Sequence, residues 1–382
     1  MIARPITRRT LIQRGAAGAA ILSLPGLLAA CGGGGGGGAS DEVKDTLNFA
    51  NWPLYVDVDE DTKTFPTLDK FTEETGIKVN YFEEINDNAT YFAKVQGPLS
   101  QGRSIDRDIF VFTDNSRFPS LLIENGWVEK LNKDLIPNIS NLIPAQQSPP
   151  FDPDREYSLP WQSGMTGIAW NPKLTGPVTS IEQLLTDPKL KGKVTMLTEM
   201  ADSVGLVMKQ NGDDPTSVSD DTFDAAIAVV QKAVDDGQIR RFTGNDYAQP
   251  LSQGNIAAAV AWSGDIVQLQ IDNPDLEFAI PDAGGMIWTD NMLVPLGGSA
   301  ATASTFMNFV YDPVNAAPIE AYVNYIPPVA GTKDELAKID PELANNPLII
   351  PDDATLEKVS GFDATALNNE SYIKKWQQVL GA

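Results

Sequence analysis

The chain has 382 residues, a formal net charge of −23, a single cysteine and no histidine. The lack of histidine excludes Ser-His-Asp and Cys-His catalysis as well as imidazole metal ligation, and so negative a charge disfavours binding to nucleic acid or anionic lipid. No P-loop or G-x-S-x-G motif occurs. The composition therefore favours binding over catalysis, with no cofactor and no metal expected, while a carboxylate-only enzyme such as a glycosidase stays open.

The N-terminal segment has the features of a bacterial export signal. Arg8 and Arg9 precede an apolar run, and this arrangement is typical of the twin-arginine route. The run ends in Leu-Ala-Ala-Cys, which resembles the lipobox in which the cysteine becomes the lipidated first residue, and seven glycines follow as a flexible tether. We expect a signal peptide over residues 1–30, lipidation of Cys31 within a tether over 31–45, and a protein held at the outer face of the cell membrane.

Beyond this tether, strand-like and helix-like segments alternate, which is typical of an α/β fold with mostly parallel sheets. Asp221–Asp236 is the clearest helix, because its apolar residues recur at helical spacing, Ser219 or Asp220 caps its start and Gly237 follows its end. We expect strands at 46–50, 77–82, 108–112, 194–197 and 276–280, and helices at 64–75, 91–101, 117–125 and 221–236.

The length of the chain exceeds the size at which one hydrophobic core usually keeps growing, so two lobes are expected. A proline-rich stretch at residues 148–160 and the Gly284-Gly285 turn are the candidate boundaries between them. In open α/β sheets, ligands bind beyond the carboxyl ends of the strands. The functional residues are therefore sought in the segments that follow the predicted strands.

Those segments are unusually aromatic and acidic. A tryptophan face beside a carboxylate is how proteins hold organic cations, and each cation–π contact contributes about 0.5–2 kcal/mol, so several must converge. Asp290 lies two residues after Trp288, a spacing that puts both side chains on one side of an extended segment. Trp127, Trp161, Trp170 and Trp376 are assigned to packing. The candidate site residues are Trp52, Tyr55, Thr113, Asn115, Glu199, Asp202, Trp262, Trp288 and Asp290.

Several short motifs also occur in a characteristic order from about Leu47 to the C-terminus. They include Asn51-Trp52-x-x-Tyr55-Val56, Gly284-Gly285-x-x-Trp288-x-Asp290 and Asn324-Tyr325-x-Pro327. In this order they resemble the periplasmic spermidine/putrescine-binding proteins, the soluble receptors of polyamine ABC importers.

The resemblance implies a monomeric, two-lobed periplasmic-binding-protein fold of type II-like topology, with a hinge and an interlobe cleft. Lobe 1 would comprise residues 46–158 and about 289–333, and lobe 2 residues 159–288 and about 334–382. The implied ligand is a polyamine and the implied partner an ABC transporter permease. Asp290 would pair with an ammonium and Thr113 would donate its hydroxyl to the ligand, inside an aromatic box of Trp52, Tyr55, Trp262, Trp288 and Tyr325.

This chain departs from the family pattern in its second-lobe acidic motif. Met200 and Ser203 fall on the usual carboxylate positions, with Glu199 and Asp202 one residue away. Either Glu199 or Asp202 turns into the pocket, or the pocket has lost one charged end, so the identity of the amine stays open. A sugar on the same fold is an alternative ligand. A cell-surface glycosidase using Glu199 and Asp290 is an alternative function and needs the two acids about 5–10 Å apart.

Overall fold

The computed structural model describes residues 42–381. The predicted signal peptide, the lipidated cysteine and most of the predicted tether therefore lie outside the described residues. Within 42–381, no helix combines the length and the apolar character needed to cross a bilayer.

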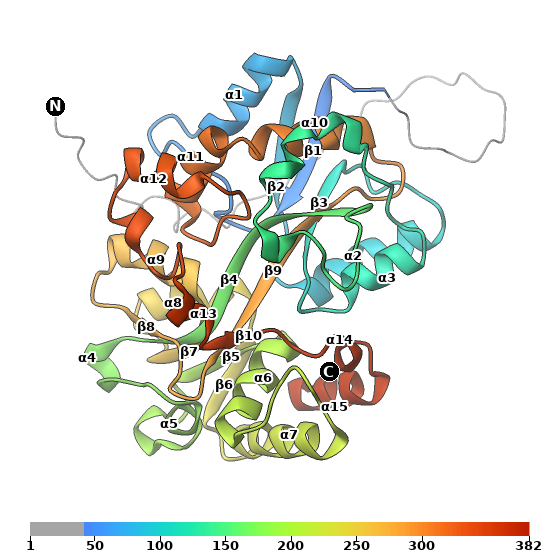
Figure 1. Ribbon diagram of the computed structural model, residues 1–382. Helices are drawn as coiled ribbons and strands as arrows, with labels where there is room; N and C mark the ends of the chain where they lie inside the picture. Colours follow the sequence, from blue (N-terminus) through green and yellow to red (C-terminus); the bar gives the residue numbers. More distant parts are fainter. Residues whose placement is uncertain (1–41, 382) are drawn as a thin grey trace, which may run out of the picture.

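The described residues form one continuous mixed sheet, in the strand order β2-β1-β3-β9-β4-β7-β5-β6, and outside this path β8 pairs with β4 and β10 with β9. Two long antiparallel strands, β4 (Ser158–Trp170) and β9 (Gly285–Leu293), run through the middle of the molecule and join its two lobes (Figure 1). We use "first lobe" for the side that contains β1, β2 and β3, and "second lobe" for the side that contains β5, β6 and β7. The remaining strands are β1 (Thr46–Asn51), β2 (Lys78–Glu83), β3 (Ile109–Thr113), β5 (Val194–Leu197), β6 (Ile239–Thr243), β7 (Ala258–Trp262), β8 (Glu277–Ala279) and β10 (Val359–Ser360).

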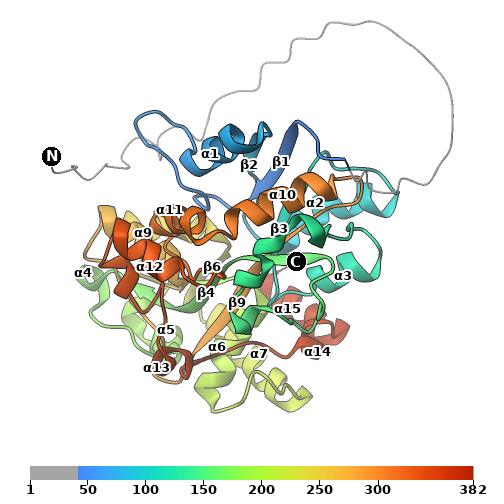
Figure 2. The same cartoon turned by 45° about the horizontal axis from the view of Figure 1, so that its top comes forward.

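Helices cover both lobes. In the first lobe α10 packs on β1 and α1 packs on α11, and in the second lobe the C-terminal helix α15 packs against α7 (Figures 1 and 2). The helices are α1 (Pro66–Thr75), α2 (Asn88–Ser100), α3 (Phe118–Glu124), α4 (Pro172–Thr175), α5 (Ile181–Thr186), α6 (Met200–Asn211), α7 (Asp220–Asp235), α8 (Ala248–Ser252), α9 (Ser263–Asp272), α10 (Ala300–Val310), α11 (Pro313–Val323), α12 (Thr332–Ile339), α13 (Asp353–Leu356), α14 (Ala364–Leu367) and α15 (Glu370–Leu380). Short 3₁₀ turns occur at Lys133–Leu135, Pro137–Asn141, Pro144–Gln146, Pro188–Leu190, Asn245–Tyr247 and Leu343–Asn345.

The local sequence explains the best-defined elements. Every residue of β3 and β7 is buried, as expected for central strands with helices on both faces. Helix α7 begins at a capping box in which the Ser219 hydroxyl accepts from the backbone N–H of Thr222. Helix α1 ends at Gly76, whose φ of +79° is a left-handed conformation that glycine adopts at no steric cost.

Four predicted strands coincide with β1, β2, β3 and β5, and the four predicted helices coincide with α1, α2, α3 and α7, within three residues at every end. The prediction of a strand at 276–280 is correct, but the prediction that this strand is buried is wrong. This segment forms the three-residue strand β8, which pairs only with β4 and in which Glu277 is exposed.

The expectation of mostly parallel sheets is also wrong at the centre of the molecule. β9 pairs antiparallel with both β3 and β4, and β4 pairs antiparallel with β7. The end of the proline-rich stretch at 148–160 opens β4, and the Gly284-Gly285 turn opens β9. Proline and glycine mark loop boundaries locally, but here they stand beside the two strands that connect the lobes. The exact lobe boundaries stay a prediction.

Candidate ligand-binding site

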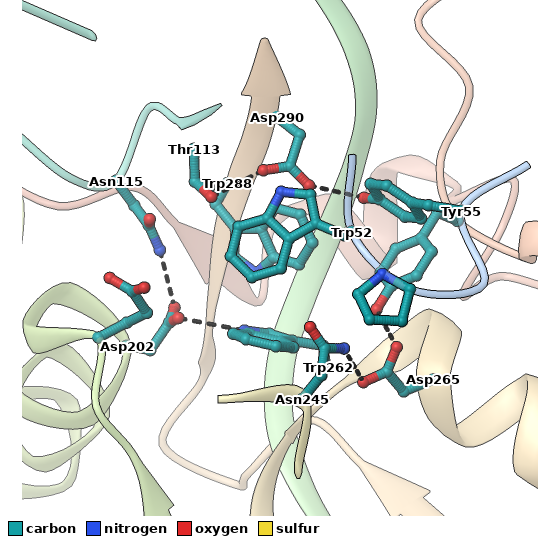
Figure 3. A pocket seen from close by; sticks show the side chains of 13 residues that line it. Trp52, Tyr55, Thr113, Asn115, Asp202, Asn245, Trp262, Asp265, Trp288 and Asp290 are labelled. Carbon is teal, nitrogen blue, oxygen red and sulfur yellow. Dashed lines mark hydrogen bonds between the residues drawn. The ribbon is translucent and has the colours of Figure 1, made fainter. Parts of the chain in front are cut away.

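A pocket lies between the lobes, where β4 and β9 cross the molecule (Figure 3). All ten candidate residues line it, including both Glu199 and Asp202, together with Pro53, Asn245 and Asp265. Four of these thirteen lining residues carry a carboxyl group and none is lysine or arginine. The lining is therefore aromatic and acidic, with no positive charge of its own. Trp127, Trp161, Trp170 and Trp376 do not line it.

Most of the lining residues stand where strands end, as predicted. Trp52 directly follows β1, Thr113 ends β3 and Trp262 ends β7. Three lining residues are exceptions: Trp288 and Asp290 lie within β9, and Tyr325 follows helix α11. The alternate positions of Trp288 and Asp290 in an extended strand turn both side chains toward the pocket, as Figure 3 shows.

Five aromatic rings form a continuous cage. The ring centroids of Trp52 and Trp262 are 6.0 Å apart, those of Trp262 and Trp288 are 6.0 Å apart, and those of Trp288 and Tyr325 are 5.7 Å apart. Tyr55 completes the series with its centroid 5.1 Å from that of Tyr325. The interplanar angles lie between 55° and 89°, so the rings meet edge to face or tilted and keep π faces available for a ligand.

Two glycines make room for this cage. A Cβ on Gly164 would lie 2.5 Å from the Trp288 ring, and a Cβ on Gly264 would lie 2.4 Å from the Tyr325 ring. Real Cβ atoms essentially never approach so closely. The absence of a side chain at these two positions therefore determines where the Trp288 and Tyr325 rings lie.

Asp290 is held by two hydroxyl groups. Tyr55 donates to its Oδ2 and Thr113 to its Oδ1, each at 2.7 Å, and the residue is 3% exposed. Burial, with a smaller contribution from the nearby carboxylates of Asp114 and Asp202, raises the pKa of Asp290 to about 7, although the hydrogen bonds from Thr113 and Tyr55 lower it. In this structure the Thr113 hydroxyl is directed at Asp290. Each Asp290 oxygen accepts only one of these bonds, so the carboxylate keeps the capacity to accept from a ligand.

Asp202 holds two tryptophans of the cage in place, Trp262 directly and Trp288 through Thr166. Its Oδ1 accepts from Asn115 Nδ2 at 3.1 Å and from Thr166 Oγ1 at 2.8 Å, and its Oδ2 accepts from Trp262 Nε1 at 3.2 Å. Thr166 also accepts from Trp288 Nε1 at 3.0 Å, so both indole N–H groups are satisfied away from the cage. Burial raises the pKa of Asp202 to about 6.

Asp265 is a pocket carboxylate that the sequence reasoning did not select. Its Oδ2 accepts from Tyr247 and Asn245, and its Oδ1 accepts from the Tyr325 hydroxyl at 2.7 Å. Burial raises its pKa. The available signal was its place in the first turn of the helix that follows Trp262. Figure 3 shows Asp290, Asp202 and Asp265 approaching the pocket from different sides.

Glu199 is engaged by a residue of the first lobe. Its Oε1 accepts from the backbone N–H of Asn88 at 3.1 Å and from Asn88 Nδ2 at 3.0 Å. Burial raises the pKa of Glu199 to about 8. Asn88 carried no signal in the sequence beyond its place near the start of a predicted helix.

The chemistry of this pocket suits organic cations. Among residues 42–381, no three cysteine, aspartate or glutamate side chains lie close enough together to hold a metal ion. Buried carboxylates without a positively charged partner are costly, and ammonium groups pair with them through charge-assisted hydrogen bonds. Aromatic faces attract the same groups through the ring quadrupole.

A two-lobed α/β fold with a pocket between the lobes is the architecture of a solute-binding protein. The model of the bacterial extracellular solute-binding protein family matches residues 67–351, and the chain belongs to this family. It is 26% identical over 342 residues to the spermidine/putrescine-binding periplasmic protein of Salmonella typhimurium, covering 88% of this chain and 92% of that protein. It is 27% identical over 327 residues to the putrescine-binding periplasmic protein PotF of Escherichia coli, covering 80% and 83%.

Solved structures agree with this assignment. A structure assigned to a spermidine/putrescine ABC transporter of Listeria monocytogenes has a TM-score of 0.73 and 26% identity, covering 88% of this chain and 98% of that one. The resemblance seen in the sequence motifs is confirmed at the level of the family, and the two-lobed fold is confirmed with it.

Proposed function

We propose that this protein captures a small organic cation with at least two amino groups, of the putrescine and spermidine type, outside the cytoplasm and delivers it to an ABC importer. The observation that carries the proposal is the pocket lining, which combines four carboxyl groups with five aromatic rings and has no lysine or arginine. The named relatives support the same ligand class.

Two carboxylates are the strongest candidates for the ammonium groups. Asp290 and Asp265 each line the cage, and each carboxylate can accept further hydrogen bonds beyond those it receives from neighbouring side chains. A diamine would place one ammonium at each acid and its methylene chain against the aromatic faces. Asp202 would contribute negative charge while it holds the indoles in place.

The same lining argues against a sugar. A neutral ligand would leave all four carboxyl groups without a counter-charge in a buried site, whereas a diamine supplies positive charge where it is missing. The family also favours a binding protein over a carboxylate glycosidase.

Location is the second part of the proposal. We propose that the protein is a lipoprotein anchored through Cys31 at the outer face of the cell membrane. The support is the Leu-Ala-Ala-Cys sequence with the glycine tether behind it. The names of the relatives place those proteins in the periplasm.

Thermal unfolding tests the ligand class directly. The purified protein, with Cys31 replaced by alanine to prevent lipidation, is unfolded with putrescine, spermidine, glycine betaine and glucose in turn. A ligand at 100 times its Kd stabilises the folded state by about 2.7 kcal/mol. We expect stabilisation by the two polyamines and none by glucose. Stabilisation by glucose alone, or by no amine, would refute the polyamine proposal.

A further inference from the structure

Glu199 connects the two lobes across the pocket. It immediately precedes α6 in the second lobe, and Asn88 is the first residue of α2 in the first lobe. Both N–H donors of Asn88, one from the backbone and one from the side chain, converge on Glu199 Oε1. Asn88 is 1% exposed and Glu199 is 8% exposed, so this contact is sealed from solvent.

The position of Asn88 explains why it needs an acceptor from outside its own lobe. The first N–H groups of a helix have no partner within that helix. Asp87 caps α2 by accepting from the backbone N–H of Thr90 at 2.7 Å, which leaves the backbone N–H of Asn88 free for another acceptor. Glu199 satisfies this donor and a side-chain donor with one oxygen.

The contact continues to the ligand-facing carboxylate. Asn88 Nδ2 also donates to Thr113 Oγ1 at 2.9 Å, and Asn88 Oδ1 accepts from the backbone N–H of Thr113 at 3.0 Å. The Thr113 hydroxyl in turn donates to Asp290, its partner in the pairing of β3 with β9. One hydrogen-bonded series therefore runs from the second lobe, through Asn88 and Thr113, to Asp290.

We propose that Glu199 is a positioning residue that fastens the closed lobes together and orients Asp290 through Asn88 and Thr113, without itself pairing with an ammonium group. The proposal rests on the proposed function, because it concerns the closed, ligand-holding form. It assigns Glu199 the role of a hydrogen-bond acceptor, whereas the sequence reasoning made it a candidate ligand-binding residue.

Two substitutions distinguish this role of Glu199 from that of a carboxylate that binds an ammonium group. Glutamine keeps a carbonyl oxygen that can accept both Asn88 donors, and alanine removes it. Burial raises the pKa of Glu199 to about 8, so its carboxyl group is mostly neutral at pH 7 in this closed form and glutamine resembles it. A residue whose charge held an ammonium would lose its function in both variants.

Stopped-flow kinetics with putrescine and spermidine provide the test. Two lost hydrogen bonds to an acidic side chain correspond to about a tenfold or larger effect. We expect Glu199→Ala to dissociate ligand about tenfold faster or more, with association within about threefold of wild type, because the contact forms only after closure. Glu199→Gln should stay within about threefold of wild type in both rates. Equal losses in Glu199→Gln and Glu199→Ala, or no effect of Glu199→Ala, would overturn the proposal.

A second interlobe contact supplies the matched control. Arg117 Nη1 lies 2.7 Å from Glu370 Oε1, between α3 in the first lobe and the start of α15 in the second, but the Glu370 side chain is 81% exposed. Exposed ion pairs contribute little, so Glu370→Ala should change dissociation by less than about twofold. A tenfold effect of this control would show that any interlobe contact matters equally, and the specific role of Glu199 would fall.

Substitutions on both sides of the contact, at Asn88 and at Glu199, test the proposal even if the alanine variant folds poorly. Asn88→Asp retains the oxygen that accepts from the backbone N–H of Thr113 but turns a second oxygen toward both Glu199 and Thr113 Oγ1, so dissociation should accelerate about tenfold or more. Adding Glu199→Gln supplies an amide that can accept the backbone N–H and donate to the new carboxylate. The double variant restores the contact between residues 88 and 199 but not the donation to Thr113 Oγ1, so we expect it to dissociate more slowly than Asn88→Asp alone without returning fully to wild type. A double variant as fast as Asn88→Asp alone would refute the pairing. Wild-type protein that binds no amine would instead refute the proposed function.

Discussion

Asp290→Asn is the most informative single substitution in the pocket. The side chain keeps its shape while losing the charge that a bound ammonium requires. Losing one partner of a buried charged pair costs about 2–5 kcal/mol, which corresponds to a Kd raised by about 30-fold or more. The full effect is expected because Asp290 is 3% exposed, so little water remains to replace the missing partner.

The same substitution should leave the ligand-free protein nearly as stable as wild type. Burial raises the pKa of Asp290 to about 7, so about half of this carboxyl group is neutral at pH 7, and asparagine has the shape of that neutral form without the cost of a buried charge. One of its two donors, Tyr55 or Thr113, meets an amide nitrogen in the variant and must rotate its hydroxyl to accept. We expect a change in unfolding free energy within about 1 kcal/mol.

Isothermal titration calorimetry with putrescine and spermidine at pH 8, combined with thermal unfolding without ligand, measures both quantities. A large loss of affinity at unchanged stability assigns Asp290 to the ligand. Equal affinities in wild type and variant would remove Asp290 from the site. Loss of affinity together with a large loss of stability would mean that Asp290 supports the fold instead.

Three further predictions follow from the pocket and its surroundings. Because burial raises the pKa of Asp290 to about 7 and also raises the pKa of Asp265, and pairing with ammonium requires their ionised forms, binding should release protons and Kd should fall as pH rises from about 5.5 to 8. Titrations in buffers of different ionisation enthalpy would measure this release, and an affinity independent of pH would contradict it. Gly264→Ala should displace the Tyr325 ring and weaken polyamine binding about tenfold or more, whereas Gly97→Ala, which meets nothing within 4 Å, should leave binding unchanged. Cys31→Ala should move the protein from the membrane fraction to the soluble extracytoplasmic fraction, and unchanged fractionation would refute the lipid anchor.

The parts of the site that the sequence predicted are those determined by local signals. Trp52, Thr113 and Trp262 stand at strand ends, and strand ends are readable from runs of apolar residues that stop at polar ones. The spacing of Trp288 and Asp290 also predicted correctly that both side chains turn the same way, although the element that contains them was misassigned.

The parts that could not be predicted depend on long-range pairing. β9 occupies its place because it pairs with β3 and with β4, which are remote from it in the chain and antiparallel to it. Asn88 meets Glu199 across 111 positions of sequence, so neither residue indicates its partner locally. Trp161, by contrast, was assigned to packing, and it stacks against Phe306 in the core and does not line the pocket.

The electrostatics of the pocket link ligand recognition to closure. Closing the lobes around four carboxyl groups without a lysine or arginine either desolvates negative charge or forces the carboxyl groups to take up protons, and both are costly at neutral pH. A diammonium ligand removes that cost, whereas a neutral molecule of the same size does not. On the proposed function, the protein would therefore not need an individually strong contact to reject neutral solutes, because closing over these carboxyl groups is unfavourable until a cation fills the pocket. Selectivity for charge would then follow from the absence of lysine and arginine in the pocket lining as much as from the presence of Asp290 and Asp265.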